Sequence, residues 1–238
     1  MQTQIALKEY SMSRVIMSFL TMLAMTMCAS AHFVFVVPDA KDKTKVVVVF
    51  SDDLEVDENI PAERLKGLKL TGRFEGGKEA PVECKPGKSC LTGELGLFGP
   101  QCVYGMFAYG VMQKGDAKPY LLAYHPKAVF AGADPKHITL GEKVIPVELV
   151  PVVSGSDIKF QFLAAGKPVA DVEVTVIKPE GGKTKVKTDK DGLTQAFPAK
   201  GRYGAWAKYI DAMAGEHDGK KYDEARHYAT LVFDAAEK

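Results

Sequence analysis

The stretch GKPVADVEVTVIKPEGGKTKVKTDKDG, residues 166–192, carries the clearest signature of the fold. From Val172 to Val176, every second residue is valine and the residues between are polar. Because successive side chains of a strand point to opposite faces, this alternation predicts a half-buried β-strand. The turn sequences PEGGK and DKDG then place Gly182 and Gly192 where a hairpin requires positive φ. This stretch therefore predicts one strand-turn-strand unit of a β-sandwich.

Similar short segments run through the rest of the chain from residue 32 onward. They are rich in Val, Ile, Tyr and Phe and are bounded by Gly, Pro and Asp, which is typical of strands in sandwiches. These further segments are HFVFVVP (32–38), KVVVVF (45–50), LKLTGRF (68–74), QCVYGMFAYGVM (101–112), PYLLAYH (119–125), VIPVELVPV (144–152), DIKFQFLAAG (157–166), GRYGAWAKYI (201–210) and RHYATLVF (226–233). The clearest helix candidate is NIPAERLKGL, residues 59–68, in which Pro61 suits a first helical turn and Gly67 suits the end.

The pattern predicts an all-β protein made of two β-sandwich domains, Ig-like or prealbumin-like. The segment PVELVPVVSGSD, residues 146–157, contains two prolines and a small polar stretch before a new series of strands begins. We therefore expect an N-terminal sandwich over residues 32–150 and a C-terminal sandwich over residues 151–238.

Residues 1–31 have the anatomy of a secretory signal peptide. Arg14 precedes a nearly uninterrupted apolar run, which ends at the small-residue sequence ASA, residues 29–31. The run is shorter than the ~20 apolar residues of a spanning helix. We expect cleavage before His32, a soluble product in the periplasm or outside the cell, and no insertion into the membrane after the signal is removed.

The charge balance argues against a nucleic-acid or anionic-membrane partner. The full chain has 31 basic and 30 acidic residues. Lys8, Arg14 and Glu9 would leave with the signal peptide, so 29 basic and 29 acidic residues would remain. A strongly basic surface is therefore not expected.

Three cysteines follow the signal peptide: Cys84, Cys90 and Cys102. The sequence ECKPGKSC places the first two around a Pro-Gly turn, which predicts a Cys84–Cys90 disulfide in an oxidising compartment. Cys102 is then left free, as a small buried hydrophobe. A thiolate metal site is the alternative, but the chain has no C-x-x-C pair to indicate it.

Two resemblances to known families follow from these motifs. The sequences GKPVADVEVTV and TDKDG resemble the small sandwich modules of the carboxypeptidase-regulatory or transthyretin-like kind. The wider arrangement, which opens with AHFVFVVP and closes with YDEARHYATLVF, resembles the DUF4198 family, whose members include periplasmic proteins found beside nickel and cobalt uptake systems. The resemblance implies two sandwich domains, periplasmic metal handling and, as a partner, a membrane metal transporter. Function inherited in this way is an analogy.

His32 is the strongest candidate metal ligand, because cleavage would give it a free amine as well as an imidazole. An α-amine has a pKa near ~8, so it can lose its proton to a metal at neutral pH. Together with Nδ1 of the same residue, it closes a six-membered chelate. One further imidazole would complete the histidine brace that suits Cu(II), and square-planar nitrogen sites also suit Ni(II). The alternative is an exposed terminal histidine that binds only water.

Three other histidines are candidates for the second ligand. Alternation in RHYATLVF places His227 on the apolar face, where a core imidazole bonded to a carbonyl is the plainer interpretation. His125 ends the segment PYLLAYH, at a strand mouth that suits a site or ordinary exposure to solvent. His217 lies in a polar loop with several potential ligands, but this composition is also typical of an ordinary solvent-exposed loop. His137 has least to recommend it.

Other chemistries find little support. The acidic segment SDDLEVDE, residues 51–58, has the i, i+2 spacing of a calcium loop, but Glu58 stands where that loop needs Gly, and Arg64 where it needs Glu. Hydrolase and phosphate-loop signatures are absent from the sequence. Aromatic and Met side chains in residues 101–112 could form a sugar platform or a soft Cu(I) site, although on strands they more often form core.

Three functions follow as hypotheses. The first is an exported protein that buffers or delivers Cu or Ni through His32. The second is a metal-free extracellular binding or interaction module. The third is an enzyme, a copper oxidase of polysaccharides with a histidine brace.

Overall fold

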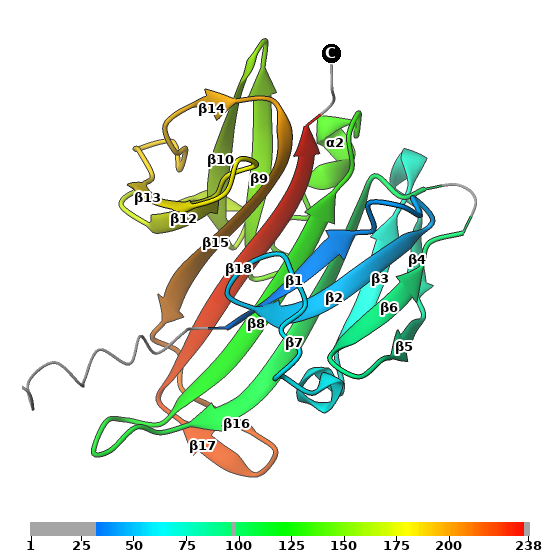
Figure 1. The fold of residues 1–238 in the computed structure, drawn as a ribbon. Helices are drawn as coiled ribbons and strands as arrows, with labels where there is room; N and C mark the ends of the chain where they lie inside the picture. Colours follow the sequence, from blue (N-terminus) through cyan, green and yellow to red (C-terminus); the bar gives the residue numbers. More distant parts are fainter. Residues whose placement is uncertain (1–31, 97–98, 236–238) are drawn as a thin grey trace, which may run out of the picture. The chain divides into compact units, whose positions relative to one another are not determined.

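A long, mostly antiparallel sheet of eight strands organises the fold (Figure 1). The structure is a computed structural model that describes residues 32–96 and 99–235, so the predicted signal peptide lies outside the described residues. The strand order is β13-β12-β15-β18-β8-β7-β3-β4. The strands are β3 (Lys69–Arg73), β4 (Glu79–Val82), β7 (Cys102–Met112), β8 (Tyr120–Val129), β12 (Glu173–Ile177), β13 (Lys183–Lys187), β15 (Gly201–Asp211) and β18 (Glu224–Ala235).

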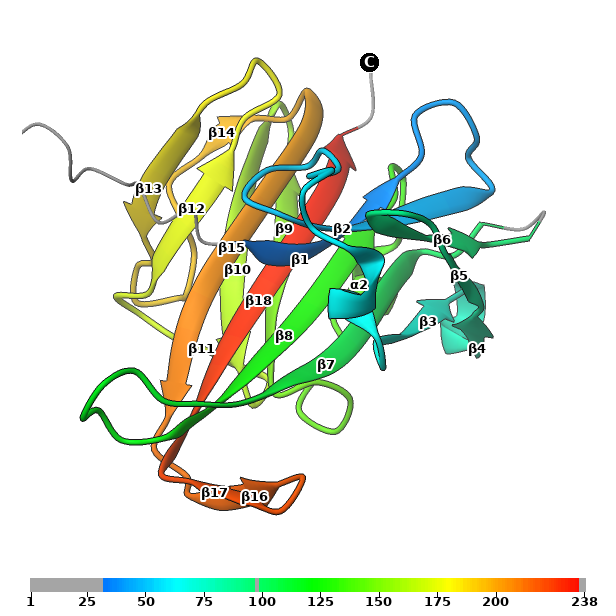
Figure 2. The same cartoon turned by 60° about the horizontal axis from the view of Figure 1, so that its bottom comes forward.

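Two smaller sheets pack against the long one, and a third extends from its end (Figure 2). The first has the order β1-β2-β6-β5, the second contains β11-β10-β14 with β9 paired to β10, and the third is the hairpin β16-β17. Their strands are β1 (Phe33–Pro38), β2 (Lys45–Ser51), β5 (Cys84–Pro86), β6 (Cys90–Glu94), β9 (Val147–Ser154), β10 (Asp157–Ala164), β11 (Lys167–Pro168), β14 (Phe197–Pro198), β16 (Gly215–His217) and β17 (Lys220–Tyr222). Helical turns are confined to η1 (Ala62–Leu65), η2 (Glu75–Gly77) and α2 (Pro135–Ile138) within the described residues.

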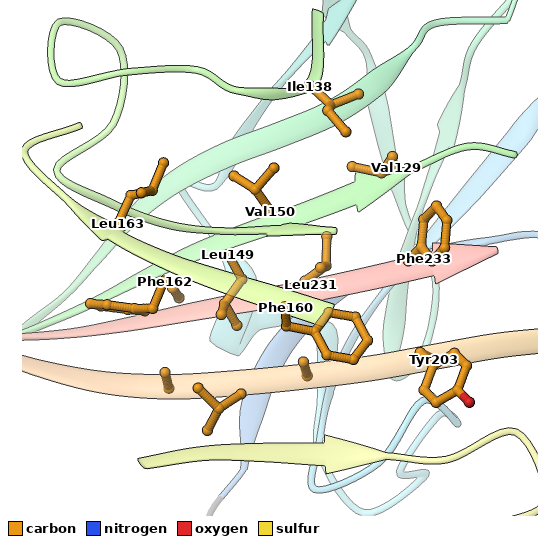
Figure 3. Packing of buried hydrophobic residues seen from close by; sticks show 14 of the residues in the cluster. Val129, Ile138, Leu149, Val150, Phe160, Phe162, Leu163, Tyr203, Leu231 and Phe233 are labelled. Atoms are coloured by element: carbon orange, nitrogen blue, oxygen red, sulfur yellow. The ribbon is translucent and has the colours of Figure 1, made fainter. Parts of the chain in front are cut away.

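Each face of the long sheet has its own hydrophobic core. Along β18, Leu231 points into a core shared with β9 and β10, whereas the next residue, Val232, points into a core shared with β1 and β2. Phe160 and Phe162 of β10 fill the first core and have no exposed surface (Figure 3). The period of two along the central strands therefore produces two sandwiches that share one sheet.

A parallel pair at the centre of the sheet joins the two halves of the sequence. β8 and β18 pair in parallel, with Tyr124 opposite Tyr228. β9 begins before residue 150 and ends after it, so the expected domain boundary falls inside a strand. The described chain from His32 onward forms one compact unit, and the β8–β18 pair joins the two ranges, 32–150 and 151–238, that the sequence predicts as separate domains. The all-β fold class is confirmed.

A buried ion pair fixes the segment that links β8 to β9. Lys127 Nζ and Glu148 Oε2 lie 2.6 Å apart, and both side chains are almost fully buried. Glu148 also accepts hydrogen bonds from the backbone N–H groups of Leu140 and Gly141, each at 3.0 Å. Lys127 donates to the carbonyl of Ile138 at 3.1 Å. Both buried charges are thus hydrogen-bonded, as buried ions must be.

The predicted disulfide is absent from the structure. In the β5–β6 hairpin, Cys84 lies opposite Gly93, which is three residues along β6 from Cys90. At ~3.3 Å per residue, the two cysteine positions are about 10 Å apart, beyond the ~7 Å that a disulfide spans. Cys84 and Cys90 are therefore free thiols, and so is Cys102, which is buried as expected.

The helix candidate of residues 59–68 is also shorter than expected. Only Ala62–Leu65 is helical, as one 3₁₀ turn, and Pro61 precedes it without a side-chain cap. Gly67 has φ of +95°, so it ends the turn as the sequence predicts.

Candidate metal-binding site

His32 lies directly before β1, whose six residues are all buried. β1 packs across β8 and β18 of the long sheet, and Phe33 stacks on Trp206 with ring centroids 4.0 Å apart. This packing fixes the backbone at His32. The imidazole remains partly accessible, with 24% of its side-chain surface exposed.

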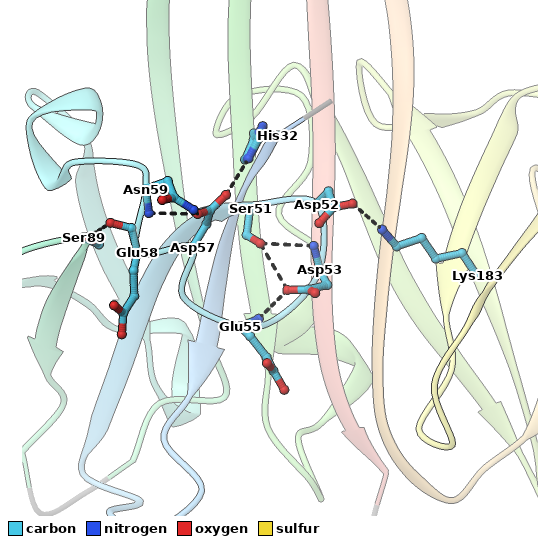
Figure 4. A network of polar contacts seen from close by, with 10 residues as sticks. All are labelled: His32, Ser51, Asp52, Asp53, Glu55, Asp57, Glu58, Asn59, Ser89 and Lys183. Carbon is cyan, nitrogen blue, oxygen red and sulfur yellow. Dashed lines mark hydrogen bonds and ion pairs between the residues drawn. The ribbon is translucent and has the colours of Figure 1, made fainter. Parts of the chain in front are cut away.

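The imidazole of His32 is oriented by a carboxylate from the loop after β2 (Figure 4). His32 Nε2 and Asp57 Oδ2 are 2.9 Å apart. The other oxygen of Asp57 accepts hydrogen bonds from the backbone and side-chain nitrogens of Asn59, at 2.9 and 3.0 Å. The hydrogen bond from His32 is the main cause that lowers the pKa of Asp57. An ionised carboxylate can only accept, so Nε2 carries the proton and the lone pair of a neutral ring lies on Nδ1.

Two aromatic residues also contact His32. The hydroxyl of Tyr124 in β8 donates to the backbone carbonyl of His32 at 3.4 Å. The ring of Phe50 meets the imidazole edge-on, with centroids 5.9 Å apart. Burial raises the pKa of Tyr124, so its hydroxyl keeps the proton that it donates.

The remaining acidic residues of the loop do not form a calcium site. Asp53 accepts hydrogen bonds from the hydroxyl of Ser51 at 3.1 Å and from the backbone of Glu55 at 2.8 Å. Asp52 forms an ion pair at 3.0 Å with Lys183 of β13 (Figure 4). The carboxylates thus order the loop and hold it in place, consistent with its failure to match a calcium loop.

His125 and His227 lie next to each other, on the opposite face of the long sheet from His32. In β8, Tyr124 points toward His32, so the next residue, His125, points to the other face. In β18, Tyr228 packs on Phe33, and His227 therefore also points away from His32. The structure therefore does not bring His125 or His227 together with His32.

The two other histidines are placed elsewhere. His217 is in the terminal hairpin, where its Nε2 lies 3.4 Å from the carboxylate of Asp218. His137 is in α2, and its Nε2 accepts a hydrogen bond from the backbone of Gly76 at 3.3 Å.

Across residues 32–96 and 99–235, no group of three or more His, Cys, Asp and Glu side chains is arranged to hold a metal ion. In the same residues, no helix has the length and apolar character needed to cross a bilayer.

Comparison with known proteins identifies no family for this chain. No family model matches the sequence, and no curated protein is similar to it. What the protein does must be inferred from its own residues.

The role of Asp57 has no local signal in the sequence. It lies 25 residues from His32 and reaches it only because the loop after β2 folds back over the start of β1. The i, i+2 spacing of the acidic residues reflects the turns of the loop. It does not indicate that Asp57 pairs with His32.

Proposed function

We propose that this is an exported protein that binds Cu(II) or Ni(II) at His32 and buffers or delivers the ion. Removal of residues 1–31 gives His32 a free amine, and this amine and Nδ1 chelate the metal. The observation that carries the proposal is the 2.9 Å hydrogen bond between His32 Nε2 and Asp57.

Asp57 supports the chelate by accepting a hydrogen bond from the imidazole that coordinates the metal. A metal-bound histidine usually donates its other ring N–H to a carboxylate, which fixes the tautomer and raises the basicity of the coordinating nitrogen. The Nε2 proton of His32 already has this arrangement. The same bond leaves Nδ1 as the coordinating nitrogen, and Nδ1 is the one that closes a six-membered ring with the α-amine.

The small number of protein ligands suits delivery better than permanent storage. Two nitrogens of one residue fill only part of the coordination sphere of Cu(II) or Ni(II), and water or a donor from a partner fills the rest. The partly exposed ring makes that exchange possible. A membrane metal transporter is the partner that the DUF4198 resemblance suggests, and Cu(II) binds more tightly than Ni(II) at such nitrogen sites.

The proposal is tested by calorimetric titration of Cu(II) and Ni(II) into protein that begins at His32, with its mass verified. We expect one site. One glycine added before His32 should abolish this site, because the amine becomes an amide. Asp57→Asn should weaken binding by roughly 10- to 100-fold, the usual cost of losing the carboxylate that hydrogen-bonds to a metal-bound histidine.

Asp53→Asn is the matched control, because Asp53 lies in the same loop but accepts its hydrogen bonds from Ser51 and Glu55. It should leave the affinity unchanged. Equal affinities in the glycine-extended and processed proteins would refute the chelate. So would exported protein whose first residue is not His32.

A further inference from the structure

An apolar cavity lies at one end of the core between the long sheet and the sheet that contains β9 and β10. Its volume is about 260 Å³. Val129, Ile138 and Phe233 line it, and all three are buried members of that core (Figure 3). Val153 of β9 also lines it and is 53% exposed, so the cavity opens to solvent. The cavity is therefore a mouth that leads from the surface into the interior of this sandwich.

The cavity exists because the strands around it end at different levels. The last pair between β18 and β8 joins Phe233 to Val129, where β8 ends, and β18 then continues to Ala235. Beyond this pair the cavity is bordered by loops and by α2 as well as by strands. Small side chains leave space unfilled where these segments meet. The small residues that line the cavity are Gly132, Ala133, Gly155, Ala199 and Ala235.

The lining favours an uncharged ligand. Within the described part of the chain, every residue that lines the cavity is Gly, Ala, Val, Ile, Pro or Phe. A charged group moved into such surroundings loses its hydration and gains no partner, which is strongly unfavourable. Asp134 and Lys136 flank the lining residue Pro135, and Lys200 follows the lining residue Ala199. All three charged residues are exposed, so water screens their charges.

The volume sets the size of the ligand. An apolar cavity of about 150 Å³ stays dry and binds benzene, which has six carbon atoms. The cavity here is roughly 1.7 times as large, so it accommodates a molecule of about ten carbon atoms. Phe233, Pro135 and Pro151 contribute ring faces to the lining, and flat faces of this kind pack well against a planar aromatic molecule.

We propose that this cavity binds a small, uncharged aromatic molecule of the size of naphthalene. The ligand enters past Val153 and packs against Phe233, and burial of its apolar surface drives binding. The cavity belongs to the core on one face of the long sheet, whereas β1, which follows His32, belongs to the core on the other face. Binding here is therefore independent of the function proposed for His32.

The probe for the first test is 2-naphthol, titrated by calorimetry into metal-free protein that begins at residue 32. We expect one site per chain and a negative heat-capacity change, which marks the burial of apolar surface. The comparison ligand is 2-naphthoate, which has the same rings and a carboxylate, and it should bind at least about tenfold more weakly. If 2-naphthoate binds as tightly as 2-naphthol, the proposed uncharged ligand is wrong.

Two neighbouring valines provide a matched pair of variants that locates the site. Val153 and Val152 are both exposed, at 53% and 38%, but successive residues of a strand point to opposite faces and only Val153 lines the cavity. Val153→Asp places a charge at the mouth and should weaken the binding of 2-naphthol at least about tenfold. Val152→Asp should leave the affinity unchanged.

A variant that fills the cavity gives a second measurement. Ala133→Leu enlarges a lining side chain, so it should weaken the binding of 2-naphthol without lowering the melting temperature, because it fills apolar space. The absence of saturable binding of 2-naphthol, or equal affinities in Val153→Asp and Val152→Asp, would overturn the proposal. So would full affinity in an Ala133→Leu protein whose melting temperature is unchanged.

Discussion

At the residue scale, the paired histidines should make the fold sensitive to mild acid. Burial lowers the pKa of His125 to about 3 from 6.5, and it also lowers the pKa of His227. Between pH 6.5 and about pH 3, His125 binds a proton in the unfolded chain but not in the folded chain. The free energy of unfolding is therefore highest above pH 6.5 and decreases as the pH falls. Each histidine contributes a slope of at most about 1.4 kcal/mol per pH unit. Urea unfolding of metal-free protein at pH 7 and pH 5 measures this loss.

The double variant His125→Leu/His227→Leu is the control for this prediction. Replacing both partners of a buried polar pair by apolar groups can be nearly neutral, so the variant should fold. Its stability should change less between pH 7 and pH 5 than that of the parent. Equal pH dependence in the two proteins would assign the acid sensitivity to other groups.

How far the sequence can predict single residues depends on how local the cause is. Alternation along RHYATLVF correctly places His227 on the apolar face of its strand. Its partner, His125, lies 102 residues away and is brought beside it by the parallel pairing of β8 and β18, which no local pattern encodes. The partnership of His32 with Asp57 has the same origin, since it depends on how one loop folds over another strand.

At the scale of elements, the β5–β6 hairpin predicts which thiols react. Cys84 and Cys90 are half-buried, whereas Cys102 is fully buried and its pKa is raised to about 11 by that burial. Thiolates are the reactive form, and burial also raises the pKa of Cys84. Cys84 and Cys90 are still partly accessible, so alkylation of the folded protein near pH 8 should label both, Cys84 slowly, and spare the fully buried Cys102. Intact-mass measurement of the chain from residue 32, which lacks Cys28, would show two added groups in the folded protein and three after unfolding.

This thiol count also tests the pairing of the strands. A Cys84–Cys90 disulfide would leave no label on either residue unless a reductant is added. That result would require a hairpin register shifted from the one in which Cys84 faces Gly93.

Whole elements are easier to predict than their exact extent. Every strand segment expected from composition and alternation corresponds to a strand of the structure, because those patterns report burial directly. The sequence does not predict the short strands β4, β5, β6, β11, β14, β16 and β17. They contain Pro, Lys and Gly, and they are formed by pairing with a neighbour more than by burial of their own side chains. Residues 59–68 form only one helical turn. The backbone N–H of Ala62 donates to the carbonyl of Lys88, a tertiary contact that the local sequence does not indicate.

At the scale of the whole molecule, the long sheet binds the two halves of the sequence into one structure. β8 comes from residues before 150 and β18 from residues after 150, and they are neighbours along ten paired positions. β18 also contributes Val232 to the core that includes β1 and β2. The segment 146–157, with its prolines and glycine, overlaps β9. The chain passes there from the long sheet, which contains β8, to the sheet that contains β9 and β10. The sequence signal for a linker and the signal for a sheet-to-sheet crossing are the same.

The shared sheet predicts that the chain from residue 32 unfolds as one unit. Two separate sandwiches would unfold independently, whereas removing β18 from this sheet would expose both cores at once. Chemical denaturation should therefore give one transition that coincides for fluorescence of Trp206, in the second half, and for exchange of backbone amides in β2, in the first. Residues 32–150 expressed alone should lack dispersed amide signals in NMR spectra, because β8 would lose its central partner. Two separated transitions, or a folded fragment, would show that the two halves fold independently. The parallel β8–β18 pair would then be a contact between domains.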